Sequence, residues 1–265
     1  MRTIIRVERA NCCVFNNSIN REIASINGVY AVNVDNYKNE VTIDHTDEVN
    51  FPELFAKLRE SGYNPLEEDY FKNKAAEWDS PIKIEMAEKF IAELLKNQIP
   101  TRDNKILDYG CGTGLVGMEL SKITRDVVYL DSSESMIEIL KKKLDAQKDW
   151  GRTIIQGEIF AYNQRDIDII TTLMALHHIE DIDEVLNHIT QNILKSSGVI
   201  VIGDLTEEDG SFHNGDPVPH KGFNKEELAG KLSKAGLEVI NSYTYNTMVK
   251  GDKKFDQFIM IAKKI

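Results

Sequence analysis

The highest concentration of residues suited to chemistry is at positions 108–114, which read DYGCGTG. This run follows an apolar segment typical of a buried strand and precedes a segment with helical periodicity. Alternating glycines let a backbone turn tightly and approach a ligand closely, and a helix that follows them offers unpaired N–H groups. The run therefore predicts a ligand-binding loop at the carboxyl end of a strand, where open α/β sheets bind their ligands.

Two classes of ligand suit such a loop. Gly112, Gly114 and Gly117 also fit the G-x-G-x-x-G pattern of dinucleotide-binding loops, so a NAD-linked oxidoreductase is one interpretation. Asp108 argues against it, because a carboxylate directed at the loop repels a pyrophosphate and attracts a cation. A nucleoside with a sulfonium and an ammonium group fits better. Residues 108–114 thus resemble the first motif of class I methyltransferases that depend on S-adenosylmethionine (SAM).

The resemblance implies that Asp108, Gly110, Gly112 and Gly114 surround this cofactor. Asp131 ends the next predicted strand, at a position where an acid accepts hydrogen bonds from ribose hydroxyls. Taken alone, Asp131 would equally suit the N-cap of a helix. Beside the glycine loop, we expect it to bind the ribose.

Other positions extend the resemblance. Met136 matches a position that packs against adenine, although it also fits the apolar stripe of its own helix. Glu158, together with Ile159, matches an acidic position that accepts from the adenine amino group, with glutamate in place of the family's aspartate. Leu173 is implied to offer backbone groups to the amino-acid moiety of the cofactor.

His177 and His178 follow the fourth strand of the expected sheet and are the candidates for a general base. The pair is common in this subgroup of the family whatever the substrate, which indicates packing. Beyond these histidines, Asp204 and the loop histidines, we expect no strong acid–base dyad at the sheet edge. Catalysis should then work mainly by positioning, under a lid built from residues 70–78 and 203–223.

Strands and helices alternate from residue 105 onward, which predicts a parallel sheet covered on both faces. The strands are expected at 105–109, 127–130, 153–156, 167–172, 199–202, 237–245 and 255–262. The helices are expected at 84–95, 115–123, 136–144, 182–193 and 224–235. The resemblance implies a Rossmann-like, seven-stranded α/β sheet of order 3-2-1-4-5-7-6, with the last strand antiparallel.

A small α+β domain, residues 1–66, precedes the predicted methyltransferase domain, residues 67–265. Its elements follow the order β-α-β-β-α, with room for a short last strand after Tyr63, which is the ferredoxin-like arrangement. Residues 26–35 and 41–44 resemble the corresponding runs of heavy-metal-associated domains.

The metal chemistry of those domains needs two thiolates as C-x-x-C, because a soft metal ion prefers two sulfur ligands on one turn. Here Cys12 occupies the first ligand position and Phe15 the second, with Cys13 adjacent. We therefore expect no metal site, and a structural or partner-binding role for this domain.

The amino-acid composition limits the classes of molecule that this protein is expected to bind. The 265 residues include 32 basic and 43 acidic side chains, a net charge of −11, which opposes binding to nucleic acid or to an anionic membrane. Three cysteines suit a reducing, cytoplasmic setting. We expect no signal peptide, and no apolar run approaches the ~20 residues of a membrane span. The expected partner is a small-molecule methyl acceptor, while the oligomeric state is not predicted.

The sequence thus predicts methyl transfer from SAM to a small molecule, in the manner of the ubiquinone and menaquinone methyltransferases that it resembles. A non-catalytic SAM-binding regulatory protein would carry the same motifs. An arsenite-type methyltransferase would suit a metal-binding N-terminal domain, but that chemistry needs clustered thiols. Only Cys111 lies in the predicted catalytic domain.

Overall fold

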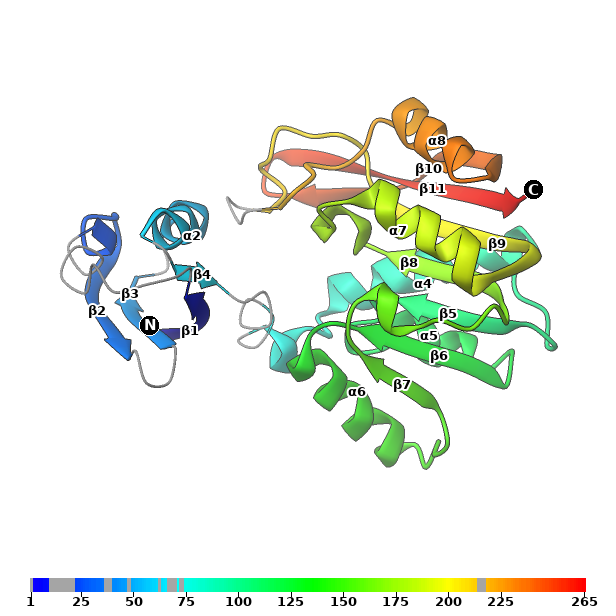
Figure 1. Cartoon of the computed structure of the whole chain (residues 1–265), viewed down its shortest axis with the longest axis horizontal. Coiled ribbons are helices and arrows are strands. Elements are labelled where there is room, and N and C mark those ends of the chain that lie inside the picture. Colours follow the sequence, from blue (N-terminus) through cyan, green and yellow to red (C-terminus); the bar gives the residue numbers. More distant parts are fainter. Residues whose placement is uncertain are drawn as a thin grey trace. The chain divides into compact units, whose positions relative to one another are not determined.

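The computed structural model describes residues 2–9, 22–35, 40–46, 49–61, 63–65, 71, 74–213 and 218–265. The chain divides into two compact units (Figure 1): the first contains the chain up to Ala75, and the second contains Ala76–Phe212 and Val218–Ile265. The predicted domain boundary between residues 66 and 67 lies outside the described residues, so it stays a prediction.

The first unit is an antiparallel sheet with an amphipathic helix. Its elements are β1 (Arg2–Arg9), β2 (Val29–Asp35), β3 (Glu40–His45), α2 (Phe51–Glu60) and β4 (Tyr63–Pro65). The strands lie in the order β2-β3-β1-β4, with β1 paired to both β3 and the short last strand β4. This pairing is the one that a ferredoxin-like unit requires.

The core of this unit joins the sheet to α2. Leu54 and Leu58 of α2 are fully buried against Ile5 and Ile43 of the sheet. Asn50 caps the helix by accepting from the backbone N–H of Glu53. The loop that holds Cys12 and Cys13 lies outside the described residues.

The second unit is built on a seven-stranded sheet. Its strands are β5 (Lys105–Tyr109), β6 (Asp126–Asp131), β7 (Thr153–Gln156), β8 (Ile167–Leu173), β9 (Leu194–Leu205), β10 (Leu237–Lys250) and β11 (Lys253–Lys264). They lie in the order β10-β11-β9-β8-β5-β6-β7, and β11 is antiparallel to both of its neighbours. The order and the antiparallel last strand are those predicted, which confirms the Rossmann-like fold class.

Helices cover both faces of this sheet (Figure 1). The helices are α4 (Pro81–Lys96), α5 (Leu115–Leu120), α6 (Glu134–Ala146), α7 (Ile182–His188) and α8 (Lys225–Lys234). Short turns of other helix types are η1 (Ala75–Glu77), η2 (Ile159–Ala161), η3 (Leu176–His178) and η4 (Ile189–Ile193).

Successive residues of each central strand point to opposite faces. Ile106 packs with α4, α5 and α6 in one hydrophobic cluster, whereas Leu107 packs with α7 and α8 in another. The central strands are therefore apolar on both sides, as the sequence predicted. No helix in the described ranges is long and apolar enough to span a bilayer.

Some element boundaries differ from the predictions. Strands β10 and β11 continue to the turn at Gly251, because backbone pairing in a hairpin extends beyond the residues that the core covers. Leu95, predicted on the buried face of its helix, is 48% exposed. It lies one residue beyond Leu94, so the helix rotates its side chain away from the sheet.

The close approach of α5 to the sheet leads to a testable prediction. A Cβ atom on Gly117 would lie 2.4 Å from Tyr129 Cε1 and 2.8 Å from Asp108 Oδ2. We expect Gly117→Ala to lower the free energy of unfolding by about 1–3 kcal/mol, because the core has no room for the methyl group.

The matched control is Gly230→Ala in α8, where an added Cβ meets no atom within 4 Å. There alanine should stabilise the protein by up to about 1 kcal/mol through helix propensity. Urea unfolding of the two variants measures the difference, and equal effects would contradict the packing argument.

Candidate functional site

The glycine loop joins β5 to α5. Gly110, Gly112 and Gly114 have φ of +68°, +53° and +85°, a region that other residues rarely adopt. A Cβ on Gly110 would also lie 2.4 Å from the Cβ of Ala175, which follows β8. The loops after β5 and β8 therefore meet where the strand order reverses direction, the position at which open α/β sheets bind ligands.

Asp131 holds the middle of this loop. Its Oδ2 accepts from the backbone N–H of Gly112 at 2.7 Å, and its Oδ1 accepts from the N–H of Ser133 at 2.9 Å. The N-cap of α6 is Ser133, whose side chain accepts from Met136 N. The alternative prediction that Asp131 is this N-cap is therefore wrong, and its carboxylate lies beside the loop.

Asp108 is buried beneath the loop, with an exposed fraction of 2%. Its two oxygens accept from the backbone N–H of Gly117 at 2.8 Å and from the Thr171 hydroxyl at 3.1 Å. Burial, together with a smaller contribution from the nearby Asp131, raises the pKa of Asp108 to about 7. Asp108 thus anchors the start of α5 and adds negative charge below the loop.

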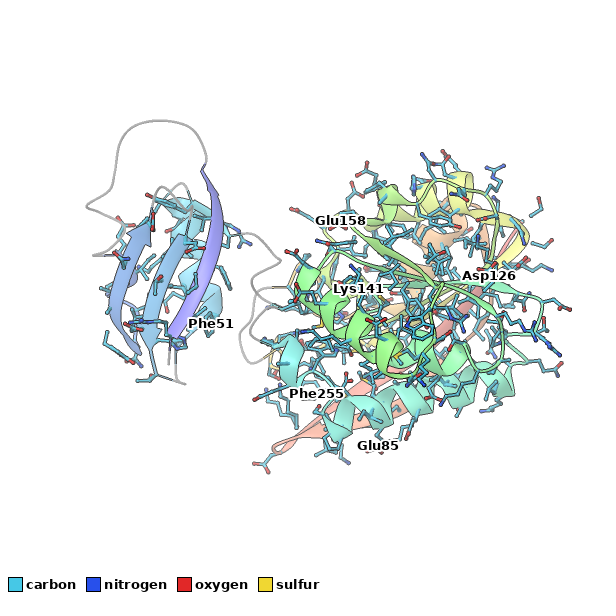
Figure 2. All side chains as sticks on the ribbon, turned by 90° about the horizontal axis from the view of Figure 1, so that it is seen from below. Phe51, Glu85, Asp126, Lys141, Glu158 and Phe255 are labelled. Atoms are coloured by element: carbon cyan, nitrogen blue, oxygen red, sulfur yellow. The ribbon has the colours of Figure 1, made fainter. Side chains whose placement is uncertain are left out.

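Glu158 supplies a third carboxylate, just after β7, and Figure 2 labels it at this edge of the unit. Gly157 donates its N–H to the backbone oxygen of Asp131 at 2.9 Å, which ties the β7 loop to β6. Burial raises the pKa of both Asp131 and Glu158, and the charge of Asp131 contributes to the shift of Glu158.

These three carboxylates share an electrostatic property. Within the described residues, neither Lys nor Arg forms an ion pair with Asp108, Asp131 or Glu158. Each pKa is raised, so the cluster lacks a positive charge that would stabilise it. The edge formed by β5, β6 and β7 therefore suits a ligand that is cationic and rich in hydroxyl groups.

The other predicted cofactor residues surround the same edge. Met136 and Ile159 are buried, at 2% and 0% exposed. Ile159 belongs to the hydrophobic cluster under α7 and α8, whereas Met136 is a member of neither cluster in this unit. Leu173 is half-buried at the end of β8, and Met174 after it has a φ of +54° and donates its N–H to Gly203.

His177 forms a buried pair that the sequence prediction missed. Its Nδ1 lies 2.6 Å from Asp204 Oδ1, and its backbone N–H donates to Asp204 Oδ2 at 3.3 Å. Both side chains are at most 2% exposed, and the His178 ring lies 4.3 Å from that of His177. The sequence named both residues but not their contact, which forms because two loops far apart in sequence meet at this edge.

The connection after β9 is shorter than predicted, since β9 continues to Leu205. Its described ends fold back on each other: Glu207 donates its N–H to Phe223, and Glu208 donates to Lys221. Residues 214–217 lie outside the described residues. Cys111, in the glycine loop, is buried, and burial raises the pKa of its thiol.

Sequence reasoning also missed two residues that contact the loop. Asp79 and Lys143 both bind Thr113, through its hydroxyl and its carbonyl oxygen respectively. Neither belongs to a motif, and α6 carries several lysines with no pattern that distinguishes one of them. The only signal was the aromatic residue Trp78 in the predicted linker.

Comparisons with known proteins agree with this geometry. Residues 82–242 match the family model described as a methyltransferase domain. An uncharacterized methyltransferase of Oceanobacillus iheyensis is 31% identical over 213 residues, covering 76% of this chain and 93% of the relative. A ubiquinone biosynthesis O-methyltransferase of Bartonella quintana is 31% identical over 189 residues, covering 63% of this chain and 75% of that protein.

For some relatives the coverage is lower. The chain spans 58% of an uncharacterized methyltransferase of Schizosaccharomyces pombe, to which it is 27% identical over 54% of its own length. Among solved structures, a SAM-dependent methyltransferase from Aquifex aeolicus superposes with a TM-score of 0.56 at 19% identity, covering 73% of this chain and 98% of that one.

The family match extends over more than half of the chain and contains the glycine loop, Asp131 and the buried pair. The chain therefore belongs to the methyltransferase domain family, and its second unit has the Rossmann-like fold of the SAM-dependent members.

Proposed function

We propose that this chain transfers a methyl group from SAM to a small-molecule acceptor, in the manner of the ubiquinone-type O-methyltransferases among its relatives. The observation that carries the proposal is the cluster of Asp108, Asp131 and Glu158 around a loop of left-handed glycines. A cationic nucleoside relieves the repulsion within this cluster, whereas the pyrophosphate of NAD would add to it.

The residues around the glycine loop suit each part of SAM: the ribose, the adenine and the amino-acid end. Asp131 has carboxylate lone pairs beyond those used by Gly112 and Ser133, and these suit a ribose diol. Glu158 suits the adenine amino group, and Met136 is a buried, polarizable side chain suited to the adenine ring. The glycine loop, with Asp108 beneath it, suits the amino-acid end.

SAM supplies a methyl group already activated on a sulfonium centre, so the protein mainly has to align the acceptor and exclude water. His177 and Asp204 hold the loop after β8 against the end of β9. We assign this pair a positioning role, because both side chains are buried. The lid that we propose then consists of Trp78 and the described ends of the connection after β9, residues 206–212 and 218–223.

The ribose assignment gives a direct prediction. Asp131→Ala should weaken binding of S-adenosylhomocysteine (SAH) about ten- to a hundredfold, because the ribose and Gly112 lose their acceptor. Asp126→Ala is the matched control, since Asp126 starts the same strand at its opposite end (Figure 2). Calorimetry that finds the two variants equally good at binding SAH would rule out the assignment.

The positioning role predicts a separation of stability from rate. His177→Ala leaves the buried Asp204 without its ring partner, so we expect a loss of about 1–3 kcal/mol in unfolding free energy. The kcat of the folded enzyme on a methyl acceptor found by metabolite screening should fall less than about tenfold. A loss beyond about 10³-fold, with His178→Ala near wild type, would instead identify a general base.

For the first unit we propose a structural or partner-binding role, on a heavy-metal-associated-like fold without its metal chemistry. Phe15 at the second ligand position supports this. Copper(I) titration of the whole chain should show no stoichiometric site that depends on Cys12. A one-to-one site lost in Cys12→Ser but kept in Phe15→Leu would show that the unit binds metal.

The two alternative functions, an arsenite-type methyltransferase and a regulatory SAM-binding protein, make different demands on the residues and on the products. An arsenite-type enzyme requires several accessible thiols, whereas Cys111 is buried and is the only cysteine in the described residues. A regulatory SAM-binding protein would bind SAH and form no methylated product when incubated with metabolite pools.

The reduced, buried Cys111 supports our proposal of a cytoplasmic location.

A further inference from the structure

The segment just before α4 is bonded directly to the glycine loop. Asp79 accepts a hydrogen bond from the Thr113 hydroxyl through Oδ1, and its Oδ2 lies 2.8 Å from Lys143 Nζ. The same Lys143 Nζ donates to the Thr113 carbonyl oxygen at 2.8 Å. Three residues from a linker, a loop and a helix thus form a closed triangle.

The triangle is largely shielded from water. Thr113 is 1% exposed, and the side chains of Asp79 and Lys143 are 32% and 27% exposed. Partial burial strengthens charge-assisted hydrogen bonds compared with an exposed surface pair. These contacts therefore connect the linker to both the glycine loop and α6.

The same segment also lies over the loop. A Cβ on Gly112 would be 3.5 Å from the indole Nε1 of Trp78, which is ordinary van der Waals contact. The Lys83 ammonium lies 3.1 Å from the centroid of the Trp78 ring, and the N–H of Ser80 donates to the Trp78 carbonyl. The indole therefore lies close to Gly112 of the loop, with the Lys83 ammonium against its ring.

We propose that Asp79, Thr113 and Lys143 form a latch that fixes Trp78 over the cofactor loop, with Asp79 as a positioning residue for cofactor binding. The inference rests on the proposed function.

Fluorescence can test the latch independently of any ligand. The sequence contains two tryptophans, and Trp150 is 70% exposed, so Trp150→Phe leaves Trp78 as the sole reporter. In that background, Asp79→Asn and Lys143→Met should increase acrylamide quenching of Trp78. Lys141→Met is the matched control, because Lys141 is an exposed residue of the same helix (Figure 2).

Binding of SAH then tests the effect on the cofactor. Asp79→Asn and Lys143→Met should each weaken SAH binding about three- to tenfold, and the double variant should be no worse than the weaker single one. Thr113→Ser, which keeps the hydroxyl, should retain binding that Thr113→Val loses. These comparisons separate a latch from general destabilisation.

The outcomes distinguish this proposal from the proposed function. If the wild type binds SAH and all latch variants match Lys141→Met in both assays, the latch is wrong. If the wild type does not bind SAH, the proposed function fails. The quenching comparison still decides in that case whether Asp79 and Lys143 hold Trp78.

Discussion

Two backbone N–H groups bonded to two carboxylates determine the geometry of this site. Gly112 donates to Asp131, and Gly117 donates to Asp108. The first bond fixes the turn of the glycine loop, and the second fixes the start of α5 below it. Because both acceptors lie near the carboxyl ends of adjacent parallel strands, the position of the loop depends on the register of the sheet.

This arrangement has an electrostatic cost. Asp108 is buried, Asp131 is half-buried and Glu158 is partly exposed, and none of them has a Lys or Arg ion-pair partner among the described residues. Loss of hydration raises the pKa of all three. Structural stability alone would favour neutral side chains at such positions. Retained charge that a ligand can neutralise is instead typical of a binding site. The same charge separates a sulfonium nucleoside from a dinucleotide, although both fit a glycine-rich loop.

Local signals were enough to predict most of the fold. The apolar strands, the glycine loop and the cap at Asn224 carry their structure in adjacent residues. The resemblance supplied the strand order, which periodicity cannot, because it says nothing about which strands pair. The long hairpin of β10 and β11 extends beyond its predicted bounds, since most residues of its outer pairs are exposed and give little apolar signal.

Only those residues of the site that belong to a sequence motif could be predicted from the sequence. Asp131 and the glycines occupy fixed spacings, whereas His177 and Asp204 are brought together by the pairing of β8 with β9. Asp79 and Lys143 likewise meet through the packing of α6 beside the loop. Contacts of this kind depend on tertiary structure, and neither residue type nor spacing reveals them in one sequence.

The most direct test of the account is calorimetric titration of the whole chain with SAM and, separately, with NADH at neutral pH. The account predicts saturable one-to-one binding of SAM and no measurable binding of NADH, because the carboxylate cluster attracts the sulfonium cation and repels the pyrophosphate. Tight binding of NADH without binding of SAM would contradict it.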